Sequence, residues 1–428
     1  MKLLATSAWC AVLLAWGQAQ KPTEMDQIAE GYVRLVLAVG LHDADYVDAY
    51  YGPPEWKPAE KDKQPLEALA VRATGLTADL ARVARPTEGL AQLRRKYLER
   101  QLSSVSARLR MLNGERLSFD DESKALYDAV APALPESHFQ QILAKLERRF
   151  PGEGPLVTRI ESYRRAFVIP REKLDAVFQT AIRACRERTV KHVALPPDEQ
   201  FTVEYVTNKS WSGYNWYQGG YRSVIQMNTD LPIYIDRAVD LACHEGYPGH
   251  HVYNVMLEKQ LVRDRGWVEF TVYPLFSPQS LIAEGTANFG IEVAFPGRER
   301  VEYERSVLFP AAGLDGARAA EYYEVQSQIE QLAYVGNEAA KRYLNGELDR
   351  EQATAWLERY ALSPRDRAAQ RVRFFDQYRS YVINYNLGKD MVRRYIESNG
   401  GTADRPAKRW EEFARLISSP RLPSGLSD

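Results

Sequence analysis

Apolar residues recur at intervals of three and four along most of this chain, and this spacing constrains its fold more than any other feature. Leu93, Tyr97, Leu98 and Leu102 are one example from the first half of the sequence. Residues with this spacing lie on one face of an α-helix, which packs against other helices to leave water. The pattern covers about residues 23–193 and returns from 236 to about 416. The sequence therefore predicts a mainly α fold.

The segment between these two helical regions has a different pattern. Phe201, Val203 and Tyr205 alternate with their neighbours, and Ser223–Asn228 is a second extended run. We expect a small β-sheet here, inserted before the second helical region. The stretch between the two runs is rich in aromatic residues and glycine, which is typical of a loop that faces a ligand, although a plain hairpin connection fits equally well.

The first nineteen residues have the pattern of a signal peptide. Lys2 precedes an apolar run from residue 3 to 16 that is too short to span a membrane, and small residues follow at Gly17 and Ala19. We expect cleavage after Ala19 and export to the periplasm or the medium, with no membrane attachment of the mature chain.

The composition is that of an ordinary globular protein and argues against binding to nucleic acid. The chain has 428 residues, of which 45% are hydrophobic and 26% charged, and its formal net charge is -1. No basic field exists that would attract phosphates. Only Cys185 and Cys243 remain after signal cleavage, and we expect them to be buried free thiols. No internal repeat divides the chain, so residues 20–428 are expected to form a single domain.

Three of the six histidines, His244, His250 and His251, lie within eight consecutive residues and beside Glu245. A histidine and glutamate pair followed by further histidines is a common way to deliver zinc ligands and a general base together. This cluster therefore predicts a zinc site.

The spacing of these histidines differs from the usual motif, in which two histidines four residues apart share a helical face. On a straight helix neither His250 nor His251 would face an ion together with His244. The segment also contains two glycines and a proline, which are the residues that kink or bulge a helix. We expect such a distortion to bring His250 to the ion. His251 is the alternative, and the histidine left over would support a ligand or face the substrate.

The third ligand of a catalytic zinc must come from elsewhere in the chain, because such sites combine three protein donors with an open position. Glu284 is the candidate, since it lies in an otherwise small and apolar helical stretch where an unpaired carboxylate is costly. Glu292 lies about two turns further on. It is expected either to hydrogen-bond at the edge of the site or to be exposed.

Three motifs of the chain are specific when taken together: His244-Glu245-x-x-Pro248-Gly249-His250-His251, Glu284-Gly285 and Tyr385-x-x-Gly388-Lys389. In these motifs the chain resembles the bacterial domain-of-unknown-function family eight-eight-five. That family is similar in outline to helical glutamate-zincin metallopeptidases such as the carboxypeptidase Taq and angiotensin-converting-enzyme families. The resemblance is close over about residues 201–394. It implies a large helical metallopeptidase-like domain with a deep cleft, in which His244, His250 and Glu284 bind Zn²⁺ and Glu245 is the general base.

The resulting hypothesis is a zinc-dependent hydrolase of metallopeptidase type that acts on a peptide or a small amide. Glu245 would take a proton from a zinc-activated water and pass it to the leaving amine. By resemblance, Tyr385 is the phenol that stabilises the tetrahedral intermediate, with Tyr378 and Tyr381 as alternatives. Two other functions fit the same residues. One is a hydrolase of a non-peptide amide or ester, and the other is a catalytically silent peptide-binding protein.

The substrate is expected to pair its backbone with the extended run Ser223–Asn228. The residues expected to contact the substrate are Tyr214, Trp216, Tyr217, Tyr221 and Asn228. These assignments divide the mature chain into a helical lobe, about residues 20–195, and a catalytic lobe, about residues 196–428.

Overall fold

The computed structural model describes residues 22–426. The predicted signal peptide, residues 1–19, lies outside the described residues. The fold is mainly helical, with 65% helix and 7% strand. The prediction of a mainly α fold with a small sheet ahead of the histidine cluster is confirmed.

The helices and strands follow one another along the chain with short connections. The α-helices are α1 (Glu24–Gly40), α2 (Leu66–Arg82), α3 (Gly89–Leu112), α4 (Phe119–Tyr127), α5 (Glu136–Arg149), α6 (Leu156–Arg164), α7 (Leu174–Thr189), α8 (Asp236–Leu241), α9 (His250–Leu257), α10 (Pro278–Ala294), α11 (Arg298–Tyr303), α12 (Phe309–Ala312), α13 (Ala319–Glu330), α14 (Val335–Leu344), α15 (Arg350–Tyr360), α16 (Arg365–Tyr378), α17 (Ile383–Ser398) and α18 (Pro406–Ile417). The strands are β1 (Val47–Tyr50), β2 (Gln200–Val206), β3 (Gly213–Gly219), β4 (Arg222–Asn228) and β5 (Val272–Pro274).

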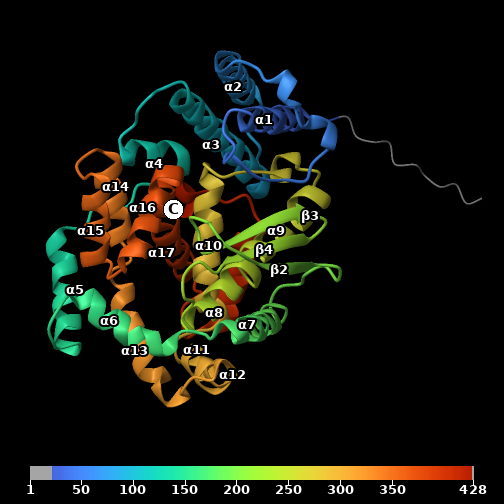
Figure 1. The fold of residues 1–428 in the computed structure, drawn as a ribbon. Coiled ribbons are helices and arrows are strands. Elements are labelled where there is room, and N and C mark those ends of the chain that lie inside the picture. The colour runs from blue at the N-terminus through green and yellow to red at the C-terminus, as the bar shows by residue number, and fades with distance from the viewer. Residues whose placement is uncertain (1–21, 427–428) are drawn as a thin grey trace, which may run out of the picture.

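Helix α10 runs through the middle of the molecule, between the helices α14 to α17 on one side and the sheet with α9 on the other (Figure 1). Nearly all of its side chains are buried. This agrees with its sequence, which is small or apolar on every face. Helices α1 to α3 cover one end of this arrangement, and α7, α8, α11 and α12 lie at the other end (Figure 1).

Helices α10 and α17 approach each other backbone to backbone at a pair of glycines. A Cβ atom on Gly285 would lie 2.5 Å from the carbonyl oxygen of Gly388. A Cβ atom on Gly388 would lie 2.7 Å from the carbonyl oxygen of Leu281. No side chain can be inserted at either position without separating the helices. The glycines therefore bring Glu284 of α10 beside the tyrosines at the start of α17.

The three-stranded sheet has the order β2, β4, β3, with β4 parallel to β2 and antiparallel to β3. The central strand β4 contains Ser223–Asn228, for which we expected pairing with a substrate backbone. That expectation is wrong, because both edges of β4 are already hydrogen-bonded within the sheet. The aromatic segment before it is not a loop but forms strand β3, which lies at an edge of the sheet.

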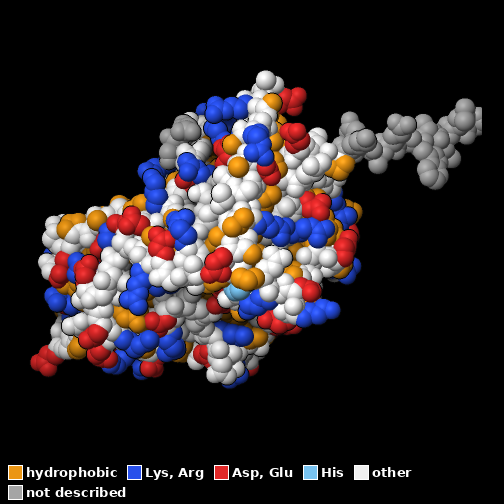
Figure 2. Space-filling model, turned by 90° about the horizontal axis from the view of Figure 1, so that it is seen from above, with side chains coloured by type: hydrophobic (Ala, Val, Ile, Leu, Met, Phe, Trp, Pro, Cys, Tyr) orange, Lys and Arg blue, Asp and Glu red, His pale blue; other side chains and the backbone are white. Residues whose placement is uncertain are grey.

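A second, two-stranded sheet joins distant parts of the chain. Strand β1 pairs antiparallel with β5, so that residues 47–50 lie beside residues 272–274. Both remaining cysteines, Cys185 and Cys243, are buried and free, as expected. Within residues 22–426 no helix is long and apolar enough to cross a membrane. On the face seen from above, cationic and anionic side chains are interspersed, with no broad area of one sign (Figure 2).

Replacement of Gly388 by alanine is expected to destabilise the protein by about 1–3 kcal/mol, because the added methyl group collides with the backbone of α10. Urea unfolding at 25 °C measures this. Gly75→Ala in α2 is the matched control, since a Cβ atom there meets nothing within 4 Å. It should be neutral or stabilising by up to about 1 kcal/mol, through helix propensity alone. Equal stability of the two variants would contradict the close helix contact.

Candidate metal centre

The histidine segment is not a regular α-helix. Helix α8 ends at Leu241 and is followed by a single π-helical turn, Ala242–Gly246, which carries the first histidine and its neighbouring glutamate. Tyr247, Pro248 and Gly249 follow in an irregular turn, and α9 begins directly at His250. A π-turn widens the helix by one residue and changes the direction of the side chains that follow. The distortion that the sequence predicted in this segment is therefore present.

Gly249 makes this irregular turn possible. Its N–H donates to the carbonyl oxygen of Cys243 at 2.9 Å. A Cβ atom at this position would lie 1.8 Å from the carbonyl oxygen of His244 and 2.4 Å from that of Cys243. Only glycine leaves room for this contact. The start of α9 is thereby placed against the π-turn, so that His250 returns to His244 in spite of the six-residue spacing.

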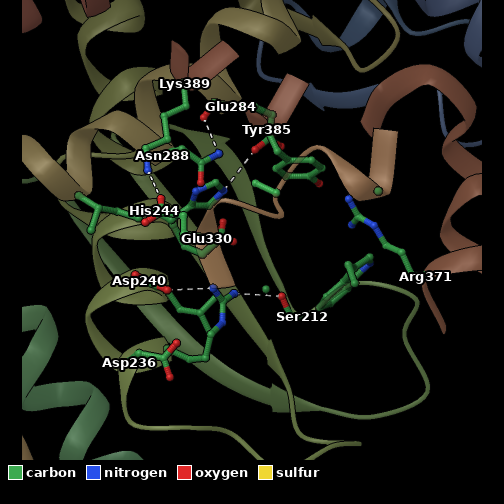
Figure 3. A pocket seen from close by; sticks show the side chains of 18 of the residues that line it. Ser212, Asp236, Asp240, His244, Glu284, Asn288, Glu330, Arg371, Tyr385 and Lys389 are labelled. Carbon is green, nitrogen blue, oxygen red and sulfur yellow. Dashed lines mark hydrogen bonds and ion pairs between the residues drawn. The ribbon is translucent and has the colours of Figure 1, made fainter. Parts of the chain in front are cut away.

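Two imidazole nitrogens and one carboxylate oxygen converge at this point. The Nε2 atoms of His244 and His250 are 3.2 Å apart. Oε2 of Glu284 lies 3.3 Å from Nε2 of His244 and 3.7 Å from Nε2 of His250. The structure thus brings together the three residues that the sequence nominated as metal ligands, two from the histidine segment and one from α10. Figure 3 shows His244 and Glu284 at the same cavity.

These distances fit a tetrahedral zinc site. Zinc bonds of 2.0–2.2 Å to nitrogen and oxygen imply donor atoms about 3.3 Å apart. The observed separations of 3.2, 3.3 and 3.7 Å define a point about 2.0 Å from all three atoms. Two imidazoles and one carboxylate are also a donor set that catalytic zinc uses, with the fourth position open.

The buried carboxylate of Glu284 supports the same interpretation. Its Oε1 accepts a hydrogen bond of 2.8 Å from the hydroxyl of Tyr381. Its Oε2 is buried and has no hydrogen-bond partner among residues 22–426, because the two nearby imidazoles lie outside hydrogen-bond geometry. An unsatisfied buried carboxylate oxygen is costly unless a cation compensates it. The oxygen that lacks a partner is the one that faces the two histidines.

The charges around the cluster favour a cation. Burial lowers the pKa of His250, but the nearby negative charge of Glu284 outweighs this effect and raises the pKa to about 9. Burial alone would raise the pKa of Glu284, yet the two histidines hold it far below its usual range. Without a metal, the His250 imidazole therefore holds a proton and a positive charge. A divalent ion at this point would displace that proton.

A second carboxylate, that of Glu245, belongs to the same cluster, since its ligand atom lies within 4.8 Å of those of His244 and His250. Its backbone oxygen accepts a hydrogen bond of 2.8 Å from the side chain of Asn215 in β3. Its side chain accepts no hydrogen bond from any described residue and lines the cavity. Burial raises the pKa of the Glu245 carboxyl, while the two histidines partly oppose the shift.

The absence of a side chain at Gly213 in β3 leaves room for this carboxylate. A Cβ atom there would lie 2.7 Å from Oε1 of Glu245. Two carboxylates can therefore reach the imidazole pair. We assign Glu284 as the ligand because its orphaned oxygen faces both histidines, which leaves Glu245 free for another role.

His251, the alternative ligand, points away from this cluster. It is completely buried, its Nδ1 lies 2.9 Å from the hydroxyl of Ser223 in β4, and its Nε2 lies 3.0 Å from Oε2 of Glu199. Burial lowers the pKa of His251, and the hydrogen bond from Glu199 opposes the shift. The geometry therefore favours His250, the expected second ligand, over the alternative His251. His251 instead fastens α9 to the sheet, next to the residue that carries the second imidazole.

The tyrosines at the start of α17 lie beside the cluster. Tyr381 holds Glu284 as described, and its ring centroid lies 5.8 Å from that of Tyr385. Tyr385 lines the cavity (Figure 3). Burial raises the pKa of Tyr385 well above its usual value, and the nearby charge of Glu284 adds to this, so the phenol keeps its proton. Tyr378 also lines the cavity, one helix earlier.

The cavity in front of the cluster has a volume of about 1000 Å³ and is lined by residues of β3 and of helices on both sides. Of the five expected substrate contacts, Tyr214 lines this cavity, and its hydroxyl donates to the carboxylate of Asp48. Trp216 is 40% exposed and lines a neighbouring cavity that shares Tyr214.

The remaining three expected contacts lie elsewhere. Tyr217 is buried and donates a hydrogen bond of 2.6 Å to Glu258. Tyr221 packs under the guanidinium of Arg263, at 4.6 Å. Asn228 donates to two backbone carbonyls of the loop before β3. Successive residues of a strand face opposite sides of the sheet, so Tyr217 of β3 lies on the side away from Tyr214.

Glu292 lies at the edge of the site, which is one of its two expected positions. It lines the cavity and forms ion pairs of 2.8 Å with Lys389 and 2.5 Å with Arg393. Burial would raise the pKa of Glu292, but the two cations hold it below its usual value. It is occupied by these partners and does not reach the imidazole pair.

Three residues of the site carried no signal that sequence reasoning could use. Asp48 of β1, Glu199 before β2 and Arg371 of α16 come from segments far from the histidines in the chain. Their roles depend on which segments the fold places side by side.

No protein-family model and no curated protein matches this sequence. Among solved structures, the chain is similar to a "putative lipoprotein" from Colwellia psychrerythraea, with a TM-score of 0.51 and 15% identity over 87% of this chain and 69% of that chain. A second likeness is to a "putative lipoprotein of unknown function" from Shewanella oneidensis, with a TM-score of 0.42 and 12% identity over 82% and 72%. The first likeness supports the helical architecture alone.

The purified mature protein is expected to bind about one zinc ion per chain. Alanine at His244, His250 or Glu284 should lower zinc affinity by more than the ~10–100-fold typical of residues that only support a ligand. The matched control is His251→Gln, which should lose stability but retain zinc. Metal analysis after dialysis, with unfolding curves in parallel, measures both. Loss of zinc from the His251 variant with retention in the His250 variant would contradict the assignment.

Proposed function

We propose that this protein is a zinc-dependent hydrolase of metallopeptidase type. The observation that carries the proposal is the convergence of His244, His250 and Glu284 on one point, with the free carboxylate of Glu245 beside it. A zinc ion held by these ligands would polarise a substrate carbonyl and make a water acidic enough to lose its proton near neutral pH. A closed structural site would instead need a fourth protein ligand, and such sites are usually rich in cysteine.

Glu245 is the general base in this proposal. Its carboxylate is open to the cavity and lies within reach of the fourth position around the histidine pair. Burial raises its pKa, which moves it towards the working pH of a proton-transfer group. Glu245 accepts a proton from the attacking water and passes it to the nitrogen of the leaving amine. The new C–O bond forms first and gives a tetrahedral intermediate, and the amide C–N bond breaks when Glu245 passes its proton to the nitrogen; water is the only co-reactant.

The two tyrosines of the site have separate tasks. Tyr381 hydrogen-bonds Glu284 and so orients the third ligand. Tyr385 has a protonated phenol at the cavity and can donate to the oxygen of the tetrahedral intermediate. The close contact of α10 with α17 holds both tyrosines at the level of Glu284.

A peptide is the substrate class that the cavity favours. Its volume of about 1000 Å³ is at the upper end of the 300–1000 Å³ usual for small-molecule sites. Strand β3 borders the cavity through Gly213 and Tyr214 and lies at the edge of its sheet. An edge strand can pair with an extended peptide backbone. This replaces the expected pairing with β4.

Export belongs to the same proposal. The apolar run and small residues at positions 3–19 support a signal peptide, and the mature chain would then act in the periplasm or the medium. Membership of the domain-of-unknown-function family eight-eight-five is likewise proposed, on the three motifs that meet at the site. The glycines of two of these motifs are the ones that bring α10 and α17 into contact.

Glu245→Gln is expected to reduce kcat for peptide cleavage by at least about 100-fold, because amide replaces the only free base at the site. Zinc content should stay at the wild-type level, since Glu245 is not a ligand. Cleavage of a peptide library, read by mass spectrometry, with zinc analysis in parallel, tests this. Wild-type turnover in the variant would contradict the mechanism. Hydrolysis of amide or ester probes without cleavage of any peptide would favour a non-peptide hydrolase.

Removal of the two tyrosine hydroxyls should have different effects. Tyr385→Phe is expected to lower kcat by about 100-fold and to leave zinc affinity unchanged, as for the loss of one donor to an oxyanion. Tyr381→Phe should weaken zinc binding by about 10-fold through its hydrogen bond to Glu284. Measurement of kcat at saturating zinc, and of zinc affinity by competition with a chelator, separates the two. The reverse pattern would exchange their roles.

A further inference from the structure

Arg371 of α16 differs from the other cations that line the cavity. No carboxylate and no hydrogen-bond acceptor among residues 22–426 pairs with its guanidinium. The other cations are paired within the protein: Arg237 and Arg300 with Asp240, Lys389 with Glu292 and Glu330, and Arg367 with the carbonyl of Pro232. The one cation at the cavity without an internal partner is therefore available to a ligand.

Aromatic rings hold this guanidinium in place. Its central carbon lies 4.8 Å from the ring centroid of Phe374, 5.7 Å from that of Phe375 and 5.6 Å from that of Tyr385. Stacking on aromatic rings fixes the plane of the group and leaves its N–H edge free. The fork of donors on that edge matches the two oxygens of a carboxylate.

The position is costly for the protein unless an anion binds there. Burial lowers the pKa of Arg371, and the only carboxylate that acts on it is Glu284, which is already engaged at the imidazole pair. Arg371 is half-buried, and a half-buried cation without a counter-charge has lost part of the hydration that it would have in open water. A negatively charged substrate group would restore it.

A short path of contacts connects Arg371 to the metal centre. Arg371 stacks on Tyr385, the ring of Tyr385 lies 5.8 Å from that of Tyr381, and the hydroxyl of Tyr381 lies 2.8 Å from Glu284. This path limits the separation of the guanidinium and Glu284 to less than about 20 Å, which at most about six extended residues would span. Figure 3 shows Arg371 and Tyr385 at the same pocket.

We propose that Arg371 binds the free C-terminal carboxylate of a peptide substrate, so that the enzyme removes single residues or short fragments from the C-terminus. The inference rests on the proposed hydrolase function. The reaction is hydrolysis: water adds across one peptide bond near the C-terminus, which leaves a new carboxylate on the long product and a free amine on the released fragment. The carboxylate that Arg371 holds is unchanged in this step.

The first test compares two peptides that differ only at the C-terminus, acetyl-pentaalanine acid and acetyl-pentaalanine amide. The wild-type protein should cleave the acid with a kcat/KM about 100-fold higher than the amide, the effect of a desolvated charge pair. Arg371→Gln should remove this preference, so that the ratio of kcat/KM for the acid to kcat/KM for the amide falls from about 100 to about 1. Arg365→Gln is the matched control, because Arg365 lies on the same helix, pairs with Glu351 and Glu358, and lines neither cavity.

The second test measures binding without turnover. Calorimetry with the Glu245→Gln protein should show that the acid binds with a Kd about 100-fold lower than that of the amide. Additional replacement of Arg371 by glutamine should abolish this difference in Kd. Equal binding of the two peptides, or equal cleavage by the wild-type protein, would overturn the role of Arg371. If the wild-type protein cleaves neither peptide but the acid still binds selectively, the hydrolase function fails while the carboxylate site stands.

Discussion

The candidate site depends on the close approach of three polar groups, an arrangement that is unfavourable without a cation. Two imidazole nitrogens and a buried carboxylate oxygen lie 3.2–3.7 Å from one another, and the carboxylate oxygen has no hydrogen-bond partner among the described residues. Such groups would normally turn towards water or towards hydrogen-bond donors. Here the backbone fixes them, because the π-turn and Gly249 hold His250 against His244, and α10 brings in Glu284 from the opposite side.

Glycines provide this fixation at both places where backbones meet. Gly249 allows its backbone to lie against the carbonyl groups of Cys243 and His244. Gly285 and Gly388 allow close contact between α10 and α17. Side chains that support the ligands then complete the site. Tyr381, in the turn just before α17, hydrogen-bonds Glu284, while Glu199 and Ser223 hold α9 against the sheet through His251. The candidate metal site thus lies where the histidine segment, α10 and the turn before α17 meet.

The sequence predicted the helices and the three residues that converge at the candidate site, because both have local signals. Apolar spacing identified the helices, and a carboxylate in an apolar stretch identified Glu284. The sequence did not predict features that depend on strand register or on residues far apart in the chain. The aromatic segment is the strand β3 rather than a loop, so that Tyr217 turns away from the cavity while Tyr214 faces it. Arg371 has no local signal at all, since its lack of a partner is a property of the folded chain.

The most direct measurement of the central claim is the anomalous diffraction of zinc-loaded crystals, recorded at the zinc absorption edge. Zinc held as proposed would give one strong peak, about 2.0–2.2 Å from Nε2 of His244, Nε2 of His250 and one carboxylate oxygen of Glu284, with a fourth position open to solvent. A peak beside His251 and Glu199, or no ordered peak between the two imidazoles, would contradict it.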